Sequence, residues 1–316
     1  MRWQGRGREG STAANLCVPP GQVNARGREV AASGQKVDLA PGLYFVATPI
    51  GAARDITLRA LDILTSADVL AAEDTRTLRH LMEIHGVPLG DRSLLSYHDH
   101  NGDRARPKLM AALAQGKSVA YASEAGTPLV ADPGFQLGRA AISAGHLVTT
   151  APGPSAAIAA LTVAGLPSDR FLFAGFAPSA GGARRQWLAD LAAVPATLVL
   201  YESPARLRAL LTDLGEIFGA DRRAAVCREL TKRFEEVVRG TLQDVAAAFA
   251  ERPVKGEIVV VIDRAAPRSA SADDAEAMLK EALECQSIRD AAASVAEALG
   301  LPKRQVYQMA LKLSAG

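Results

Sequence analysis

Six loops rich in glycine, proline, acidic and hydroxyl residues follow apolar runs of the chain, and they carry residue types that could bind a small ligand. They are residues 48–51, 73–76, 124–134, 152–155, 202–204 and 228–232. Glycine lets a backbone approach a ligand closely, and proline fixes the shape of a loop. Ser155 can cap a helix whose first N–H groups then point at a ligand. Turn formation alone explains any one loop, but their number predicts a binding cleft.

Alternating apolar runs and helical patterns must position these loops. We expect strands at residues 43–47, 69–72, 119–123, 146–150, 171–174, 197–201, 224–227 and 258–262. We expect helices over residues 57–65, 77–85, 135–144, 155–163, 184–191 and 204–218. This alternation indicates βαβ units and a mainly parallel sheet, whose ligands bind beyond the carboxyl ends of the strands.

Breaks in composition divide the chain into four segments. Residues 1–40 are polar and without period, which predicts a disordered arm. Residues 41–166 and 167–265 predict two α/β domains, separated near Leu166–Asp169. Residues 273–316 are helical in pattern and follow a linker. The predicted fold class is α/β, with two domains and a small helical extension.

The composition is that of an ordinary globular protein, with 48% hydrophobic and 22% charged residues. The net charge of +2 argues against bulk binding of nucleic acid. The arm has six basic and three acidic residues, so it carries +3 and the rest of the chain −1. The arm is either a segment that attracts RNA or an unstructured leader. In the second case it could also result from a wrongly assigned start codon.

The sequence also excludes several classes of site. Cys17, Cys227 and Cys285 lie far apart, which argues against a disulfide framework and a structural zinc site. His98 and His100 form only a weak metal pattern, so we expect no metal. Glycine spacings typical of dinucleotide-binding and P-loop folds are absent. The chain has no apolar run of 18 residues and no secretory signal, so we expect it in the cytoplasm, away from membranes.

Ten sequence strings, taken together, carry a resemblance to a known family. They are LYFVATPIG (43–51), DITLRAL (55–61), AAEDTR (71–76), SYHDHN (96–101), AGTPLVADPG (125–134), APGPSA (151–156), GLPSDRFLFAGF (165–176), YESPARL (201–207), RELTKRFEEVVRGTL (228–242) and KGEIVVVI (255–262). With these the chain resembles the tetrapyrrole (corrin/porphyrin) methylase superfamily. Within it, AAEDTR, SYHDHN and RELTK resemble the branch that methylates the ribose 2′-oxygen of a cytidine in small-subunit (16S) ribosomal RNA.

The resemblance implies that S-adenosylmethionine binds in a cleft between the two α/β domains. The residues implied to line its pocket are Thr48, Pro49, Gly51, Gly126, Thr127, Asp132, Gly153, Pro154 and Ser155, with Glu202, Leu230 and Gly256 across the cleft. Glu124, also implied to contact the cofactor, stands where the family usually has aspartate, so it keeps the charge but is one methylene longer, which would alter cofactor affinity if this carboxylate orients the cofactor. Ala52 and Ala205 replace the usual asparagine and histidine, which puts two further contacts in doubt.

Methyl transfer to a ribose hydroxyl needs in-line placement and a base that removes the proton. The candidates for the base are Glu73, Asp74 and His98, and Lys232 could stabilise the developing oxyanion. Arg76 suits a phosphate or a pair with Asp74. The alternatives are that Asp74 only caps the helix after it, and that His98 is an ordinary histidine.

RNA contacts should come from clustered charge. The clusters are Arg184-Arg185, Arg206 with Arg208, Arg222-Arg223, and Arg228 with Lys232 and Arg233. Glu235-Glu236 is expected on a solvated helix face. Residues 287–313 resemble a helix–turn–helix, which would bind RNA or serve only as a packing appendage.

The resemblance further implies a homodimer that acts on the small (30S) ribosomal subunit. The main alternative is a methyltransferase for a small tetrapyrrole-like substrate, which would not need AAEDTR, SYHDHN or basic C-terminal helices. A non-catalytic nucleic-acid-binding protein would leave the loops at the strand ends without a purpose.

Overall fold

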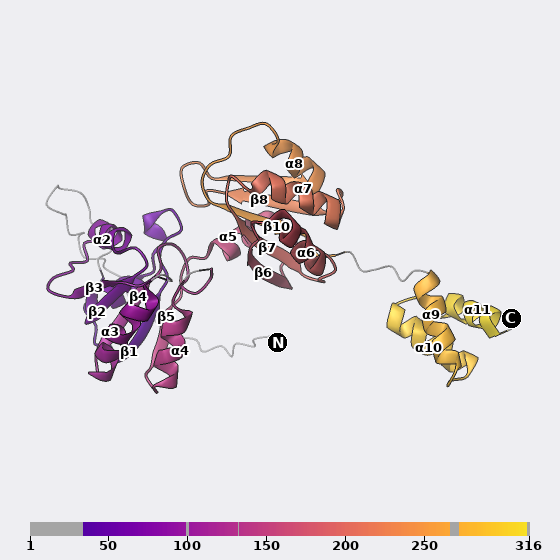
Figure 1. Ribbon diagram of the computed structural model, residues 1–316, viewed down its shortest axis with the longest axis horizontal. Helices are drawn as coiled ribbons and strands as arrows, with labels where there is room; N and C mark the ends of the chain where they lie inside the picture. Colours follow the sequence, from indigo (N-terminus) through magenta and orange to yellow (C-terminus); the bar gives the residue numbers. More distant parts are fainter. Residues whose placement is uncertain (1–33, 99–100, 132, 266–271, 315–316) are drawn as a thin grey trace, which may run out of the picture. The chain divides into compact units, whose positions relative to one another are not determined.

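The computed structural model describes residues 34–98, 101–131, 133–265 and 272–314 (Figure 1). The chain divides into two compact units. The first contains the described residues up to Val163 together with Cys227–Val237 and Gly256–Val259, and the second contains the other described segments.

The first unit is built on a five-stranded sheet in the order β3-β2-β4-β1-β5. Its strands are β1 (Gly42–Val46), β2 (Val69–Ala72), β3 (Ser93–Ser96), β4 (Ser118–Ala122) and β5 (Val148–Ala151). All neighbouring strands of this sheet pair in parallel. The helical elements are η1 (Ala53–Asp55), α1 (Leu58–Ser66), α2 (Thr75–Ile84), α3 (Gly102–Ala114), α4 (Phe135–Ser143) and α5 (Ala156–Ala164).

Two separate apolar cores cover the two faces of this sheet. Tyr44 and Val46 of β1 belong to the core formed with α1 and α2. Leu43 and Phe45 belong to the core formed with α3 and α4. Successive residues of a strand point to opposite faces, so the alternation along β1 divides its side chains between the two cores. Burial of each large apolar side chain contributes about 1.5–3 kcal/mol.

The connections leave β1 and β4 in opposite directions along the sheet. The chain passes from β1 through α1 toward β2, and from β4 through α4 toward β5. Because β1 and β4 are neighbours, their carboxyl ends form a topological switch point, where α/β sheets open a crevice for ligands.

The second sheet has the order β6-β7-β10-β8-β9. Its strands are β6 (Phe171–Phe176), β7 (Thr197–Glu202), β8 (Arg223–Arg228), β9 (Glu236–Thr241) and β10 (Ile258–Ile262). The helices α6 (Gly181–Leu191), α7 (Leu207–Phe218) and α8 (Leu242–Phe249) accompany it. β6 and β7 are parallel, with an irregularity between Phe173 and Gly175.

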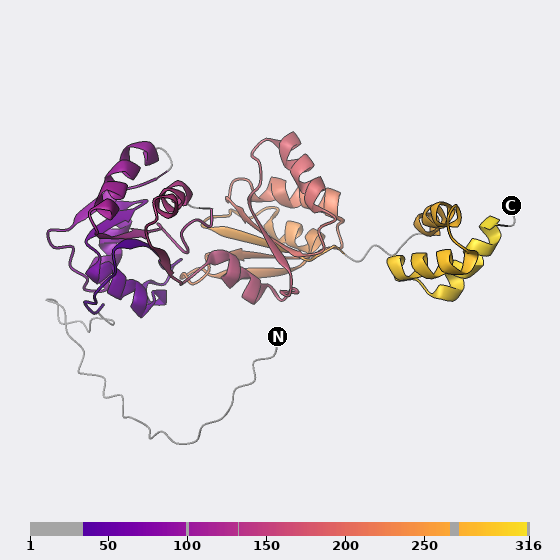
Figure 2. The same ribbon diagram turned by 90° about the horizontal axis from the view of Figure 1, so that it is seen from below.

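The C-terminal helices α9 (Ala272–Leu283), α10 (Ile288–Leu299) and α11 (Lys303–Ser314) form a small bundle with its own apolar core (Figure 2). The Ser287 hydroxyl caps α10 by accepting the Asp290 N–H. Gly300 ends α10 in the left-handed region with φ 64°, which glycine adopts without strain. The predicted helix, turn and helix are therefore confirmed.

Several sequence predictions require correction. The end of the predicted disordered arm is ordered against α1, because the Gln35 N–H donates to the Asp62 side chain and the Val37 N–H to the Ser66 side chain. Residues 1–33 lie outside the described residues. Glu236 begins strand β9 and is not on a helix. Elements without a counterpart among the predicted ones are β3, β9, η1, α3 and α8. Among the described helices, none has the length and apolarity of a membrane span.

Candidate functional site

The loops after β1, β4 and β5 are hydrogen-bonded to one another at the carboxyl edge of the first sheet. Thr48 and Gly126 form an isolated antiparallel bridge, with N···O distances of 2.9 and 3.0 Å. The Ser123 hydroxyl donates to the Gly126 carbonyl at 2.6 Å. The Thr127 hydroxyl donates to the Pro154 carbonyl at 2.8 Å. Four of the predicted pocket residues therefore lie together at the switch point.

The glycines of these loops allow neighbouring segments of the chain to pack closely. Gly126 has φ 83°, and a Cβ there would lie 3.3 Å from Ile50. A Cβ on Gly153 would lie 2.9 Å from the Ala47 side chain. A Cβ on Gly51 would lie 2.5 Å from Lys232 Cγ and 2.6 Å from Thr231 Oγ1. The loop after β8 packs on Gly51 and leaves no space for a side chain there. This packing requires glycine at position 51 more directly than the predicted approach of a ligand does.

The turn after β8 closes on the loop after β1. The Ala52 N–H donates to Thr231 Oγ1 at 3.1 Å. Glu229 and Thr231 have φ values of 53° and 63°, which are uncommon for residues with a side chain. The Glu235 carboxylate accepts the Thr231 N–H at 2.6 Å, so Glu235 supports this turn. Glu235 is exposed, as expected, but it lies next to this turn and not on a helix, and no spacing in the sequence indicates its partner.

Lys232 lies in this turn between two carboxylates. Its Nζ donates to Glu229 Oε1 at 3.0 Å and to Glu257 Oε2 at 2.8 Å. Burial alone would lower its pKa, but the hydrogen bonds to Glu257 and Glu229 outweigh burial and hold the pKa above the ordinary value. Lys232 is therefore an ammonium cation, as a role in stabilising negative charge requires.

Gly256 gives Glu229 the space that this arrangement needs. Gly256 has φ 89°, and a Cβ on it would lie 2.3 Å from Glu229 Cδ. The Glu229 carboxylate also accepts the Glu257 N–H at 3.0 Å, which lowers its pKa together with the ion pair to Lys232. Gly256 and Leu230, both predicted to contact the cofactor, thus flank or belong to the Lys232 turn. Leu230 is buried.

Asp74 follows β2 and caps α2. Its Oδ1 accepts the N–H groups of Arg76 and Thr77, and its Oδ2 pairs with Arg76 Nη2 at 2.9 Å. Hydrogen bonds from the Arg76 side chain and backbone lower the pKa of Asp74 to about 2. A carboxylate with so low a pKa is a weak base, so the geometry favours capping and positioning of Arg76 over proton removal. The negative charge of Glu124 also acts on Arg76.

Glu73 and His98 follow neighbouring strands of the same sheet. Ala72 of β2 lies opposite Ser96 of β3, so the residues after each strand meet at one edge. The Asn101 side chain fixes the second of these loops, because its Oδ1 accepts the His98 N–H at 2.9 Å and its Nδ2 donates to the Ser96 carbonyl at 3.1 Å. The structure therefore brings the three base candidates to one edge of the sheet.

Backbone strain gathers in two of the predicted loops. Among the described residues, the non-glycine residues with positive φ are Leu129, Ala131, Glu229 and Thr231. Strained residues concentrate where function fixes the backbone. Asp132, predicted to contact the cofactor, lies outside the described residues, as do Asp99 and His100. Pro49 is partly exposed beside these loops, and Ser155 directly precedes α5.

Glu202 ends β7 in the second unit and is almost fully buried. Its Oε1 accepts from Arg206, with an Nη2 distance of 2.6 Å, and from the Ser203 N–H at 2.7 Å. Its Oε2 is buried and has no hydrogen-bond partner among the described residues. A buried carboxylate oxygen without a donor is costly, so this oxygen is suited to accept from a ligand.

Most arginines predicted to contact RNA are engaged within the protein. Arg184 pairs with the buried Asp213 at 2.6 Å, and Arg185 pairs with the same carboxylate. Arg206 pairs with Glu202, while Arg208 and Arg222 donate to backbone carbonyls. Arg228 pairs with Glu236 at 3.0 Å. These guanidinium groups have partners within the protein, so each contributes to the fold, and their contact with RNA stays a prediction. Arg233 is exposed beside the Phe234 ring.

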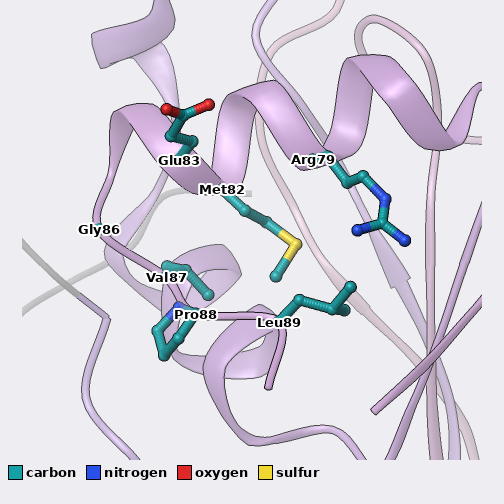
Figure 3. Close-up of a pocket in the computed structure, with 7 residues that line it drawn as sticks. All are labelled: Arg79, Met82, Glu83, Gly86, Val87, Pro88 and Leu89. Atoms are coloured by element: carbon teal, nitrogen blue, oxygen red, sulfur yellow. The ribbon is translucent and has the colours of Figure 1, made fainter. Parts of the chain in front are cut away.

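A hollow of about 510 Å³ lies elsewhere on the first unit, between α2 and the loop that follows it (Figure 3). It is lined by Arg79, Met82, Glu83, Gly86, Val87, Pro88 and Leu89. None of these seven residues belongs to the predicted site.

Comparisons with known proteins agree with the resemblance. The family described as Tetrapyrrole (Corrin/Porphyrin) Methylases matches residues 42–246, and the RsmI C-terminal HTH domain matches residues 269–314. A protein of Mesorhizobium japonicum named ribosomal RNA small subunit methyltransferase I is 48% identical over 87% of this chain and 93% of its own. A protein of the same name from Xylella fastidiosa is 46% identical over 84% and 98%.

The fold also has a counterpart among solved structures. A uroporphyrin-III-C-methyltransferase from Thermus thermophilus has a TM-score of 0.51 and 23% identity, with 70% of this chain and 94% of that chain covered. This likeness bears on the fold alone, whereas the two relatives above match nearly their whole length. The chain therefore belongs to the ribosomal RNA small subunit methyltransferase I family of the tetrapyrrole (corrin/porphyrin) methylases.

Proposed function

We propose that this chain transfers a methyl group from S-adenosylmethionine to the ribose 2′-oxygen of a cytidine in small-subunit (16S) ribosomal RNA. The named relatives support the RNA substrate. The observation that carries the proposal is the strained turn that holds the Lys232 ammonium against Gly51, at the carboxyl edge of the first sheet. Such a substrate would place the chain in the cytoplasm.

The residues present suit the cofactor. The backbone of the loops 48–51, 124–127 and 153–155 lies at the switch point of the first sheet, where α/β folds take ligands. Within the second unit, Glu202 Oε2 is a buried acceptor without a donor among the described residues, which suits a hydroxyl or amino group of a ligand. When bound, the cofactor supplies a methyl group on a sulfonium cation, which an oxygen nucleophile can attack.

The chain's own residues would then prepare the nucleophile. The Lys232 ammonium would attract a phosphate or stabilise charge that develops on the ribose oxygen. Asp74 would hold Arg76, whose exposed guanidinium suits a phosphate of the RNA. With Asp74 so weak a base, Glu73 and His98 are the stronger candidates to take the hydroxyl proton.

The proposal is tested by incubating the protein with labelled S-adenosylmethionine and small ribosomal subunits that lack the modification. We expect label in the RNA, mapped to one ribose 2′-oxygen, and loss of the label in a Lys232→Met variant. Transfer to a porphyrin precursor without transfer to subunits would contradict the RNA substrate and favour the tetrapyrrole alternative. Isolated RNA and whole subunits, tested side by side, would show whether the 30S particle is the substrate.

We also propose that the chain forms a homodimer through α4. Phe135 and Ile142 are seven residues apart on this helix, which places them on one face, and their exposed fractions are 60% and 65%. Arg139 covers the Phe135 ring from the same face. Exposed apolar side chains grouped in this way suit an interface between copies.

A further inference from the structure

The charges of the C-terminal bundle are segregated by helix. α9 carries a net charge of −3 and α10 a net charge of −1, whereas α11 carries +3 and contains no acidic residue. The bundle as a whole is therefore not basic. Its positive charge lies on the second helix of the helix–turn–helix, which makes α11 the surface on which a polyanion would bind.

One face of α11 is buried and the rest is exposed. Val306 and Ala310 pack into the core of the bundle. Arg304, Tyr307 and Leu311 follow one another at spacings of three and four residues, so they form one row on the helix surface. Tyr307 is 42% exposed and Leu311 43% exposed. An aromatic ring and an aliphatic side chain thus lie in the middle of a basic helix.

The cations at the two ends of α11 are available to a partner. Lys303 and Arg304 stand in the first turn of α11, and Lys312 stands in its last turn. None of the three forms an ion pair with a carboxylate of the described residues. They differ in this from Arg184, Arg206 and Arg222 of the second unit, whose guanidinium groups are bonded within the protein.

We propose that the exposed face of α11 binds single-stranded or junction RNA of the small subunit, with its three cations on phosphates and Tyr307 stacked on an unpaired base. The proposal rests on the function proposed above, which supplies the RNA. Side chains cannot read the deep, narrow major groove of duplex RNA, whereas unpaired bases are open to stacking and hydrogen bonds, which favours unpaired nucleotides as the target of α11. Aromatic stacking on an unpaired base suits an exposed tyrosine between cations.

Filter binding of the full chain to protein-free small-subunit RNA, over a range of salt concentrations, tests this surface. Lys303→Ala/Arg304→Ala should weaken binding and reduce the slope of log affinity against log salt by roughly 1.4, because each single-strand phosphate contact contributes about 0.7. Lys280→Ala/Arg289→Ala removes the same charge from α9 and α10 and should leave the slope unchanged. Tyr307→Ala should weaken binding about tenfold, and Tyr307→Phe should not.

The outcomes separate this surface from the catalytic proposal. Unchanged RNA affinity in the α11 variants, with melting temperatures like that of the parent chain, would contradict RNA binding by α11 even if methyl transfer proceeds. Loss of affinity in those variants supports it even if no transfer is found. Duplex DNA that competes as well as the RNA would contradict a surface for unpaired RNA. A change in molar mass by light scattering, without a change in RNA affinity, would make α11 a contact between copies.

Discussion

Lys232 is held as a cation by two carboxylates, and its stem lies against Gly51. Two of its three N–H donors are used by Glu229 and Glu257, and the third would serve a phosphate or the developing oxyanion. The pairing also gives Lys232 its position, because Glu229 is itself fixed by the Glu257 N–H. The sequence shows a lysine in this string, but its two partners are 3 and 25 residues away and become visible only in the fold.

Lys232→Met should lower kcat for RNA methylation by about 100-fold, which is typical for loss of one group that stabilises an oxyanion. The affinity for S-adenosylmethionine, measured by calorimetry, should change little. Lys232→Arg should recover part of the rate, because it keeps the charge. The raised pKa means that the charge-dependent activity is complete below pH 10.5 and is lost only above it. Equal losses of rate and cofactor affinity would make Lys232 structural.

Asp74→Asn should lower kcat more than it lowers cofactor affinity, because the amide can still cap α2 but no longer pairs with Arg76 as an anion. The shape of the pH–rate profile should not change, since the pKa of Asp74 is about 2. Because folding lowers the pKa of Asp74, the stability that its ionised carboxylate contributes is present above pH 3.8 and is lost as the pH falls toward 2. An acid limb that moves in Asp74→Asn and not in His98→Asn would identify Asp74 as the base after all.

At the scale of elements, buried strands were predictable and some edge strands were not. β1 and β10 are apolar along their whole length and buried, so their runs stand out in the sequence. β3 and β9 both lie at sheet edges, where short and polar strands are tolerated. Glu236 pairs with Arg228 of the neighbouring strand, so a residue that looks solvated in sequence is a cross-strand partner.

The loops of the site were predictable for the same reason that the buried strands were. Each loop follows an apolar run, and parallel strands bring their carboxyl ends to one edge, so loops far apart in sequence meet. The bonds between them were not predictable, because the Thr48–Gly126 bridge and the Thr231 contact depend on backbone angles that composition does not fix. The internal acceptors of Arg184, Arg206 and Arg222 were not predictable either, because they lie 4 to 41 residues away and meet these side chains only in the fold.

Gly256→Ala tests whether the Lys232 turn acts as one unit. The new Cβ would lie 2.3 Å from Glu229 Cδ, so Glu229 and its bond to Lys232 must move. Gly219→Ala is a matched control, because Gly219 has a similar φ of 94° but no atom within 4 Å of the new Cβ. Both variants should lose stability from backbone strain, measured by thermal unfolding. Only Gly256→Ala should also lose most of its methyl transfer, and a similar loss in both would separate Lys232 from the reaction.

At the scale of the whole molecule, the near-neutral net charge of +2 hides local segregation. Arg184 and Arg206 of the second unit pair with buried carboxylates, whereas α11 keeps three cations that form no ion pair among the described residues. RNA recognition then depends on a few placed charges, so its salt dependence should be modest for a protein that binds RNA.

The proposed homodimer is also a property of the whole molecule, and it predicts a specific effect of a single charge. Ile142→Lys places an ammonium on the exposed face of α4, and burial of that charge at an interface would be costly. We expect this variant to be a monomer by light scattering at concentrations at which the parent chain is a dimer. Ile84→Lys is the matched control, because Ile84 is also exposed but lies at the end of α2, a helix of the opposite core. A parent chain that is a monomer, or dimers that persist in Ile142→Lys, would remove α4 as the interface. If the monomer still binds S-adenosylmethionine but no longer methylates subunits, the second copy takes part in holding the RNA.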